Sequence, residues 1–237
     1  MNHQEYQKLA KAMIKCKRTR KFSKTNYAWD VVGNVNARKN VGSVVKLFNK
    51  CESISLEKWI NFYFESGDKF DKLTEVEQKE NAYEYGRSEK YLKEKIVPLF
   101  RKALIAAGLN NGEWTDEELY LYILVRVLYE TWMGCCSEGA LYDFVVNNFS
   151  ELIIKHTTDN EDSYFAVDFE ILSRKTRNLL LGLQVKQENV QPYILKRNKK
   201  LNERYTKEKG VNVFYVKCRK SKILNQDELT NVLMAIA

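Results

Sequence analysis

The sequence has few glycines, prolines, cysteines and histidines, which are the residues that build repetitive, disulfide-linked or histidine-metal proteins. Its 237 residues include only 10 glycines and 2 prolines, which excludes a collagen-like or linker-rich chain. The five cysteines are an odd number without a C-x-x-C pair, so we expect neither a zinc ribbon nor a disulfide framework. Two histidines, His3 and His156, are too few for a histidine-rich metal site and give poor support for a serine-histidine-aspartate triad.

Long apolar runs are also missing. No apolar stretch approaches the roughly 18 residues of a membrane span, and the start MNHQEYQKLAKAM lacks the apolar segment of a signal peptide. We therefore predict a cytoplasmic protein that has no membrane association and needs no small-molecule cofactor. The 44% of hydrophobic residues suffices for a substantial core, in one large domain or in a core with an appended subdomain.

Positive charge is concentrated in two segments. Residues 1–50 hold 12 Lys and Arg against 2 Asp and Glu, and residues 191–222 hold 11 against 2. Residues 51–135 hold 11 against 16 and are acidic. This asymmetry is typical of a surface that binds a polyanion, although solvated surface lysines would give the same count.

Apolar periodicity predicts a helical first part and a mixed second part. Helices are expected near residues 1–24, 41–50, 55–64, 74–109 and 114–132, with a kink near Pro98 and Thr115 as an N-cap. After Gly134 we expect a helix over 137–149 capped by Ser137, strands over 151–158, 163–172, 179–186 and 211–218, and helices over 192–210 and 226–237. The predicted fold is α/β (α+β), with a small mixed sheet flanked by helices in a domain of residues 134–237 and a mostly helical domain of residues 1–133.

The stretch VDFEILSRKTRNLLLGLQVK places four polar side chains on two apolar strands. Because side chains alternate along a strand, Asp168 and Glu170 share one face, and Gln184 and Lys186 share another. If the strands pair through SRKTRN, both polar pairs can meet at one edge of the sheet. An ordinary hairpin with surface charges remains the alternative, since this spacing by itself is common.

The grouped side chains suit phosphodiester hydrolysis. Mg²⁺ prefers oxygen ligands, here the Asp168 carboxylate, the Gln184 amide oxygen and the Val185 backbone carbonyl. Lys186 could orient or deprotonate a water molecule. Glu138 shares the apolar stripe of its helix and is expected to face the sheet, whereas Asp143 is rotated toward solvent.

A helix with Glu138, a strand with Asp168 and then Gln184-x-Lys186 together resemble the PD-(D/E)XK nuclease superfamily. Within it the chain resembles a type II restriction endonuclease, and NARKNVGSVVKLF, SLEKWINFYF and VDFEI…LGLQVK are similar to MjaI-type enzymes that cut at CTAG. The resemblance implies a Mg²⁺-dependent, sequence-specific endonuclease acting on double-stranded DNA. Val167 stands where the motif has proline, and Gln184 replaces an acid, so Glu170 or Glu138 would have to supply the missing charge.

A palindromic DNA site would favour a homodimer. The first domain would then serve DNA recognition and the second would hold the nuclease site. Candidate DNA contacts are Lys17, Arg18, Arg20, Lys21, Asn34, Asn36, Arg38, Lys39, Lys196, Arg197, Lys199 and Lys200. Two alternatives stay open, namely a structure-specific nuclease of the same superfamily and a nucleic-acid-binding protein without catalysis.

Overall fold

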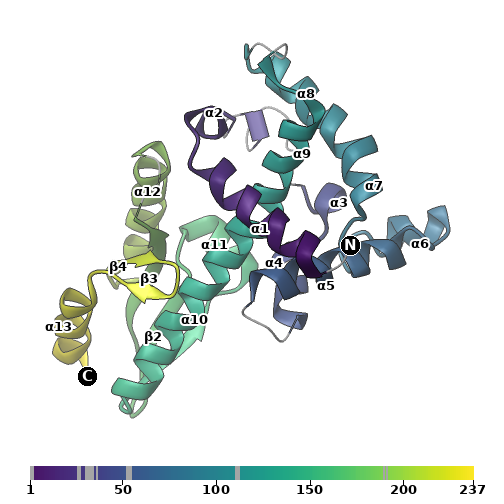
Figure 1. Cartoon of the computed structure of the whole chain (residues 1–237). Coiled ribbons are helices and arrows are strands. Elements are labelled where there is room, and N and C mark those ends of the chain that lie inside the picture. Colours follow the sequence, from purple (N-terminus) through teal and green to yellow (C-terminus); the bar gives the residue numbers. More distant parts are fainter. Residues whose placement is uncertain are drawn as a thin grey trace. The chain divides into compact units, whose positions relative to one another are not determined.

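The computed structural model divides the chain into two compact units, Met1–Trp132 and Met133–Ala237 (Figure 1). It describes residues 3–25, 28–29, 35, 37–51, 55–109, 113–188, 190 and 192–237. In the described parts of the chain, no helix combines the length and apolar character that a membrane crossing requires.

The described residues of the first unit form helices without a strand. The helices are α1 (His3–Lys17), α2 (Arg20–Ser23), α3 (Arg38–Val41), α4 (Val44–Lys50), α5 (Leu56–Phe70), α6 (Glu75–Glu80), α7 (Glu89–Tyr91), η2 (Leu92–Ile96), α8 (Val97–Ala106), α9 (Asp116–Leu124) and η4 (Val125–Tyr129). Buried aromatic residues fill the interior, among them the fully buried Trp59 and Tyr63. The Trp59 indole donates to the Leu128 carbonyl at 3.1 Å, so this large side chain is buried with its polar atom satisfied.

Local sequence signals set several helix starts in this unit. Thr115 accepts a hydrogen bond from the Glu118 backbone, and the Glu118 side chain accepts one from the Thr115 backbone, as predicted for an N-cap. The region 74–109 is divided between α6 and a second helical run that begins at Glu89. Within that run the π-helical turn η2 lies directly before the turn that contains Pro98, because proline cannot donate the usual backbone hydrogen bond.

The second unit contains a mixed five-stranded sheet in the order β1-β2-β3-β4-β5. Its elements are α10 (Glu130–Asn148), whose first three residues belong to the first unit, β1 (Leu152–His156), α11 (Asp159–Phe165), β2 (Phe169–Ser173), β3 (Leu179–Gln187), α12 (Pro192–Lys209), β4 (Val213–Arg219), β5 (Lys222–Ile223) and α13 (Gln226–Ile236). Neighbouring strands pair antiparallel except β3 and β4, which are parallel and connected through α12. The prediction of an α+β fold with a small mixed sheet is confirmed.

Helices cover both faces of this sheet. On one face, Leu141 of α10 and Leu229 of α13 pack with Phe169, Leu183 and Val216. On the other face, Tyr205 of α12 packs with Phe165 and Val167. Gly182 is required at this contact, because a Cβ atom there would lie 2.9 Å from the Tyr205 ring.

The predicted starts of two elements are wrong. Ser137 caps no helix, since α10 runs through it and its hydroxyl donates to the Met133 carbonyl at 2.9 Å. Gly134 also lies inside this helix. Residues 163–165 belong to α11 instead of a strand, because Thr158 and Glu161 form a capping box that starts a helix there.

Candidate active site

Asp168 lies immediately before β2 and is bound to the neighbouring strand twice. Its backbone N–H donates to the Leu183 carbonyl at 2.9 Å, and its Oδ2 accepts from the Val185 N–H at 2.6 Å. Burial raises the pKa of the Asp168 carboxyl, whereas the positive charge of Lys186 and the Val185 N–H act in the opposite direction. The carboxylate is therefore held in place by backbone.

The strand alternation that predicted a shared face for Asp168 and Glu170 is interrupted at Asp168. Val167 belongs to the core under α12, whereas Phe169 belongs to the opposite core, although the two positions would share a face in a regular strand. The regular alternation of side chains along β2 therefore does not extend back to Val167. The Asp168 side chain points along the sheet, to the backbone of β3.

The edge of β3 at Val185 is free of a regular strand partner. Gly182 donates to Asn212 at 2.9 Å and Glu188 to Cys218 at 3.0 Å, so the even-numbered residues of β3 bond to β4. The odd-numbered Val185 then directs its N–H and carbonyl to the opposite side. There β2 begins only at Phe169, and the Asp168 carboxylate takes the place of a strand partner.

Glu138 and Lys186 complete a cluster with Asp168, which we call the acid–lysine cluster. All three side chains are half-buried. Burial raises the pKa of Glu138 to about 7, the negative charges of Asp168 and Asp162 add to this effect, and Lys186 opposes it. Leu141 and Val145 anchor the same side of α10 in the core, which orients Glu138 toward the sheet, whereas Asp143 is exposed.

Gln184 is fully buried, and neither atom of its side-chain amide has a hydrogen-bond partner. A buried amide without partners costs roughly 1 to 3 kcal/mol, so this position calls for a ligand or a water molecule. An unpaired amide oxygen fits a hard cation such as Mg²⁺. The Nε2 atom gains nothing from a cation and needs a separate acceptor.

Glu170 is engaged elsewhere. Its carboxylate is buried and accepts a hydrogen bond of 3.0 Å from the hydroxyl of Tyr205 in α12. The charges that act on Glu138 are those of Asp168, Asp162 and Lys186, and the charge that acts on Asp168 is that of Lys186. Glu170 is not among them. The structure therefore does not bring Glu170 to the acid–lysine cluster, and Glu138 is the second acid next to Asp168.

Among the described residues, no three His, Cys, Asp or Glu side chains form a group suited to a metal ion. The predicted donors differ from such a group, because they combine two acids with an amide and a backbone carbonyl. The unpaired Gln184 oxygen, the free edge at Val185 and two carboxylates whose pKa values are raised all fit a divalent cation. Positive charge at this place would offset the mutual repulsion of Glu138 and Asp168.

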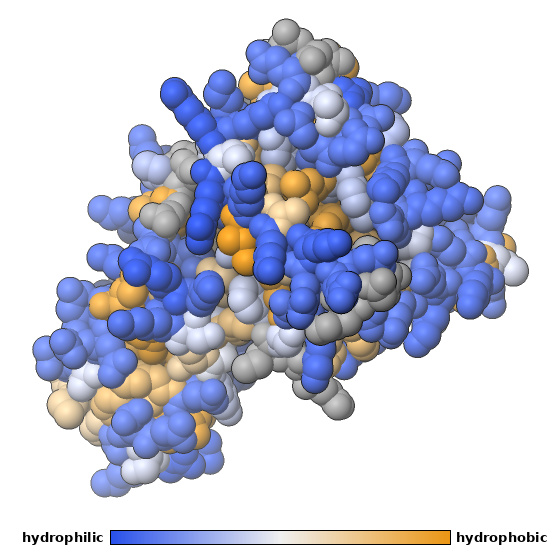
Figure 2. All heavy atoms as spheres, in the orientation of Figure 1, coloured by the Kyte–Doolittle hydropathy of each residue, from blue (hydrophilic) through white to orange (hydrophobic). Residues whose placement is uncertain are grey.

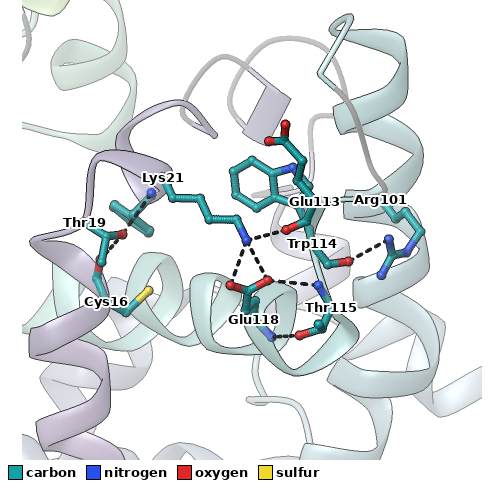
Figure 3. Close-up of polar contacts among 9 residues, drawn as sticks. Cys16, Thr19, Lys21, Arg101, Glu113, Trp114, Thr115 and Glu118 are labelled. Atoms are coloured by element: carbon teal, nitrogen blue, oxygen red, sulfur yellow. Dashed lines mark hydrogen bonds and ion pairs between the residues drawn. The ribbon is translucent and has the colours of Figure 1, made fainter.

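Two of the predicted DNA contacts in the first unit have partners within that unit. Lys17 pairs with Glu130 and lies 5.0 Å from the centroid of the Phe22 ring. Lys21 binds Glu118 at 2.7 and 2.8 Å and lies over the Trp114 ring (Figure 3). These contacts give both lysines a structural role, whatever else they contact.

The remaining predicted DNA contacts of the first unit fall into two groups, exposed residues and residues outside the described part of the structure. Arg18, Arg20 and Lys39 are exposed. Arg38 begins α3, but its side chain lies outside the described part of the structure, as do Asn34 and Asn36. Lys39 is fixed through its backbone, because its carbonyl accepts from the buried Arg87 guanidinium at 2.9 Å.

Helix α12 has a buried side with polar residues and an exposed side with basic residues. Asn198, Asn202 and Tyr205 are buried at helical spacing. The exposed residues are Lys196, Arg197, Lys199 and Lys200, and the surface over α12 is largely hydrophilic in Figure 2. No described residue forms an ion pair with any of these four, so their charges remain available to a polyanion.

The sequence reasoning missed Asn202. Its Nδ2 donates to the carbonyls of Phe165 and Ala166, both at 3.0 Å, and its Oδ1 accepts from the Tyr215 hydroxyl. Ala166 has a φ of 55°, a left-handed conformation unfavourable for alanine, and lies two residues before Asp168. The signal in the sequence was the spacing of Asn198, Asn202 and Tyr205 within a basic helix.

The second unit thus holds a mixed sheet, the acid–lysine cluster at the unpaired edge of β3, and the basic helix α12. A comparison with models of protein families matches residues 25–226 to the family described as MjaI restriction endonuclease. Since the match spans well over half of the 237 residues, the chain belongs to the MjaI restriction endonuclease family, which confirms the resemblance. Searches of curated proteins and of solved structures gave no match.

Proposed function

We propose that this protein is a type II restriction endonuclease that hydrolyses phosphodiester bonds of double-stranded DNA at a specific sequence in the presence of Mg²⁺. The observation that carries the proposal is the acid–lysine cluster of Glu138, Asp168 and Lys186 beside the free backbone edge of Val185. Membership of a restriction endonuclease family supports it. The enzyme would act in the cytoplasm, where its DNA substrate lies.

The oxygen donors around the cluster are those that would hold the ion. They are the carboxylates of Asp168 and Glu138, the Gln184 amide oxygen and the Val185 carbonyl. When bound, Mg²⁺ supplies Lewis acidity that lowers the pKa of a coordinated water and offsets phosphate charge. Glu170 has no part in this set, because its carboxylate is paired with Tyr205.

Lys186 carries the positive charge of the protein at this site. No described residue forms a direct ion pair with its ammonium group, so the Nζ atom is available to substrate. It can donate a hydrogen bond to a phosphate oxygen, orient the attacking water and stabilise the additional negative charge of the transition state. Asp168 keeps its orientation during this step because the Val185 N–H binds its Oδ2.

The basic side of α12 would contact the phosphate backbone of the same DNA. Lys196, Arg197, Lys199 and Lys200 are exposed on it, and α12 follows β3, which carries Lys186. Arg18, Arg20, Arg38 and Lys39 would add contacts from the first unit, with Asn34 and Asn36 available for base edges. A two-fold symmetric site on the DNA would be bound by a homodimer.

The test is a digest of DNA of known sequence, with Mg²⁺ or with EDTA, followed by sequencing of the fragment ends. We expect discrete fragments with Mg²⁺ only, with ends at one sequence, for which the family resemblance implies CTAG. Asp168→Ala and Lys186→Ala should stop cleavage and leave DNA binding, and Asp143→Ala, an exposed acid of the same unit, should cut normally.

Other outcomes would each contradict part of the proposal. Cleavage without a fixed end sequence would indicate a structure-specific nuclease. Salt-dependent DNA binding without cleavage in Mg²⁺ or Mn²⁺ would indicate a binding protein. Normal cleavage by both site variants would show that the reaction takes place elsewhere.

A further inference from the structure

A partly buried hydrogen bond joins Ser137, which precedes Glu138, to Gln187, which follows Lys186. Ser137 is fully buried in α10, and its Oγ accepts from the Gln187 Nε2 at 2.6 Å. The same Gln187 nitrogen lies 3.3 Å from the Met133 carbonyl. A helix and a strand that are 50 residues apart in sequence are thus connected at the acid–lysine cluster.

Ser137 also connects α10 to the turn after β4. Its hydroxyl lies 2.5 Å from the Lys220 carbonyl and 2.9 Å from the Met133 carbonyl, both of which are acceptors for its single proton. Lys220 has a φ of 54°, so this turn is held in a conformation that needs support. One hydroxyl therefore meets α10, β3 and the β4–β5 turn.

The apolar contacts of α10 do not fix this geometry by themselves. Leu141 and Val145 hold the helix against the sheet, but such contacts are non-directional and permit small shifts along the helix axis. A hydrogen bond of 2.6 Å is directional. Since a misplacement of about 1 Å can reduce catalysis by 10²-fold, the register of α10 on β3 matters to the reaction.

We propose that Ser137 and Gln187 are a positioning pair that sets the separation between the Glu138 carboxylate and the Lys186 ammonium group. This inference rests on the proposed nuclease function. Neither residue touches substrate in this arrangement, and each acts through its neighbour in the chain. Losing either partner should slow cleavage, because the hydrogen bond between them needs both.

The test uses Ser137→Ala, Gln187→Leu and the double variant, each compared with the full-length wild type. The control is Tyr205→Phe, which also removes a buried hydrogen bond of the same unit, the one to Glu170. For each protein we would measure single-turnover cleavage with Mg²⁺, DNA binding by anisotropy in EDTA, and the folded fraction by urea denaturation. Rates are expressed per folded molecule.

We expect each single variant to cleave about 10-fold to 100-fold more slowly with DNA affinity within about two-fold of wild type. The double variant should be no slower than the single variants, because the pair acts as one unit. Tyr205→Phe should keep its rate per folded molecule.

The split between the cleavage rate and the DNA affinity is the readout that a purely structural role would not give. A shift of α10 against β3 changes the distance between Glu138 and Lys186 and leaves the basic side of α12 in place, so the single-turnover rate constant at saturating enzyme should fall while the Kd for DNA stays the same. Equal losses of rate and affinity, or a rate equal to wild type, would overturn the proposal.

Two further outcomes separate this inference from the proposed function. If the wild type cuts DNA and both single variants match it after correction for folding, the positioning role is wrong and the nuclease assignment stands. If the wild type cuts no DNA with any divalent metal, the proposed function fails, and this inference fails with it.

Discussion

Glu138→Gln should make the protein more stable at alkaline pH while it removes an acid from the proposed active site. The Glu138 pKa is raised from 4.5 to about 7, first by burial and then by the charges of Asp168 and Asp162. Between pH 4.5 and about pH 7, Glu138 keeps its proton in the folded protein, whereas the same carboxyl has released it in the unfolded chain. Stability therefore falls as pH rises through this window, and the loss is complete above about pH 7.

The size of this stability change follows from the difference between the pKa of Glu138 in the folded and in the unfolded protein. A tenfold change in proton affinity is worth about 1.4 kcal/mol, so the interval corresponds to roughly 3 kcal/mol of unfolding free energy. Glutamine has nearly the same shape as glutamate and carries no charge at any pH. We expect Glu138→Gln to exceed the wild type by up to roughly 3 kcal/mol near pH 8.5 and to equal it near pH 4.5.

The assay is urea denaturation of both proteins in EDTA across this range, with Asp143→Asn as the matched control. Asp143 is an exposed acid on the same helix, so its substitution should change stability by less than about 0.5 kcal/mol at either pH. Equal stability of Glu138→Gln and the wild type near pH 8.5 would refute the reasoning, because Glu138 would then ionise without cost.

Three further predictions concern the neighbouring groups. Asp168→Asn should move the alkaline loss of stability to lower pH, because it removes a charge that raises the Glu138 pKa; an unchanged pH–stability curve would contradict this. Asn202→Ala should cost about 1 to 3 kcal/mol in urea denaturation, since the Phe165 and Ala166 carbonyls lose their donor, whereas a loss below about 0.5 kcal/mol would show that water replaces it. Replacing both Lys199 and Lys200 with Gln should lower the slope of log Kd against log salt by up to about 2, whereas Lys93→Gln, which breaks an ion pair with Glu89, should leave the slope unchanged.

Signals confined to a few neighbouring residues were readable from the sequence. The capping residue Thr115, the stop at Gly210 with its φ of 75°, and the alternating pattern of β3 each depend on local chemistry. The acids and the lysine could be named because Glu138 lies on an apolar helical stripe and Lys186 on an apolar strand. The capping box of Thr158 and Glu161 was equally local and could have predicted α11.

The errors arose where tertiary contacts outweighed local pattern. Ser137 looks like an N-cap, but its hydroxyl finds Gln187 and the Lys220 carbonyl, so the helix continues through it. Alternation assigned Glu170 to the site, whereas its buried carboxylate is paired with the hydroxyl of Tyr205 in α12.

By itself the sequence indicated the class of fold, the residues of the acid–lysine cluster and the two basic segments, because apolar periodicity, motif spacing and local charge can be read along the chain without its contacts. Only the tertiary structure decided which hydrogen-bond donors and acceptors of the site meet. It directs Asp168 to the Val185 N–H, buries Gln184 without a partner and raises the pKa of Glu138 to about 7. These properties depend on distances between elements and on the exclusion of water, which no single segment specifies.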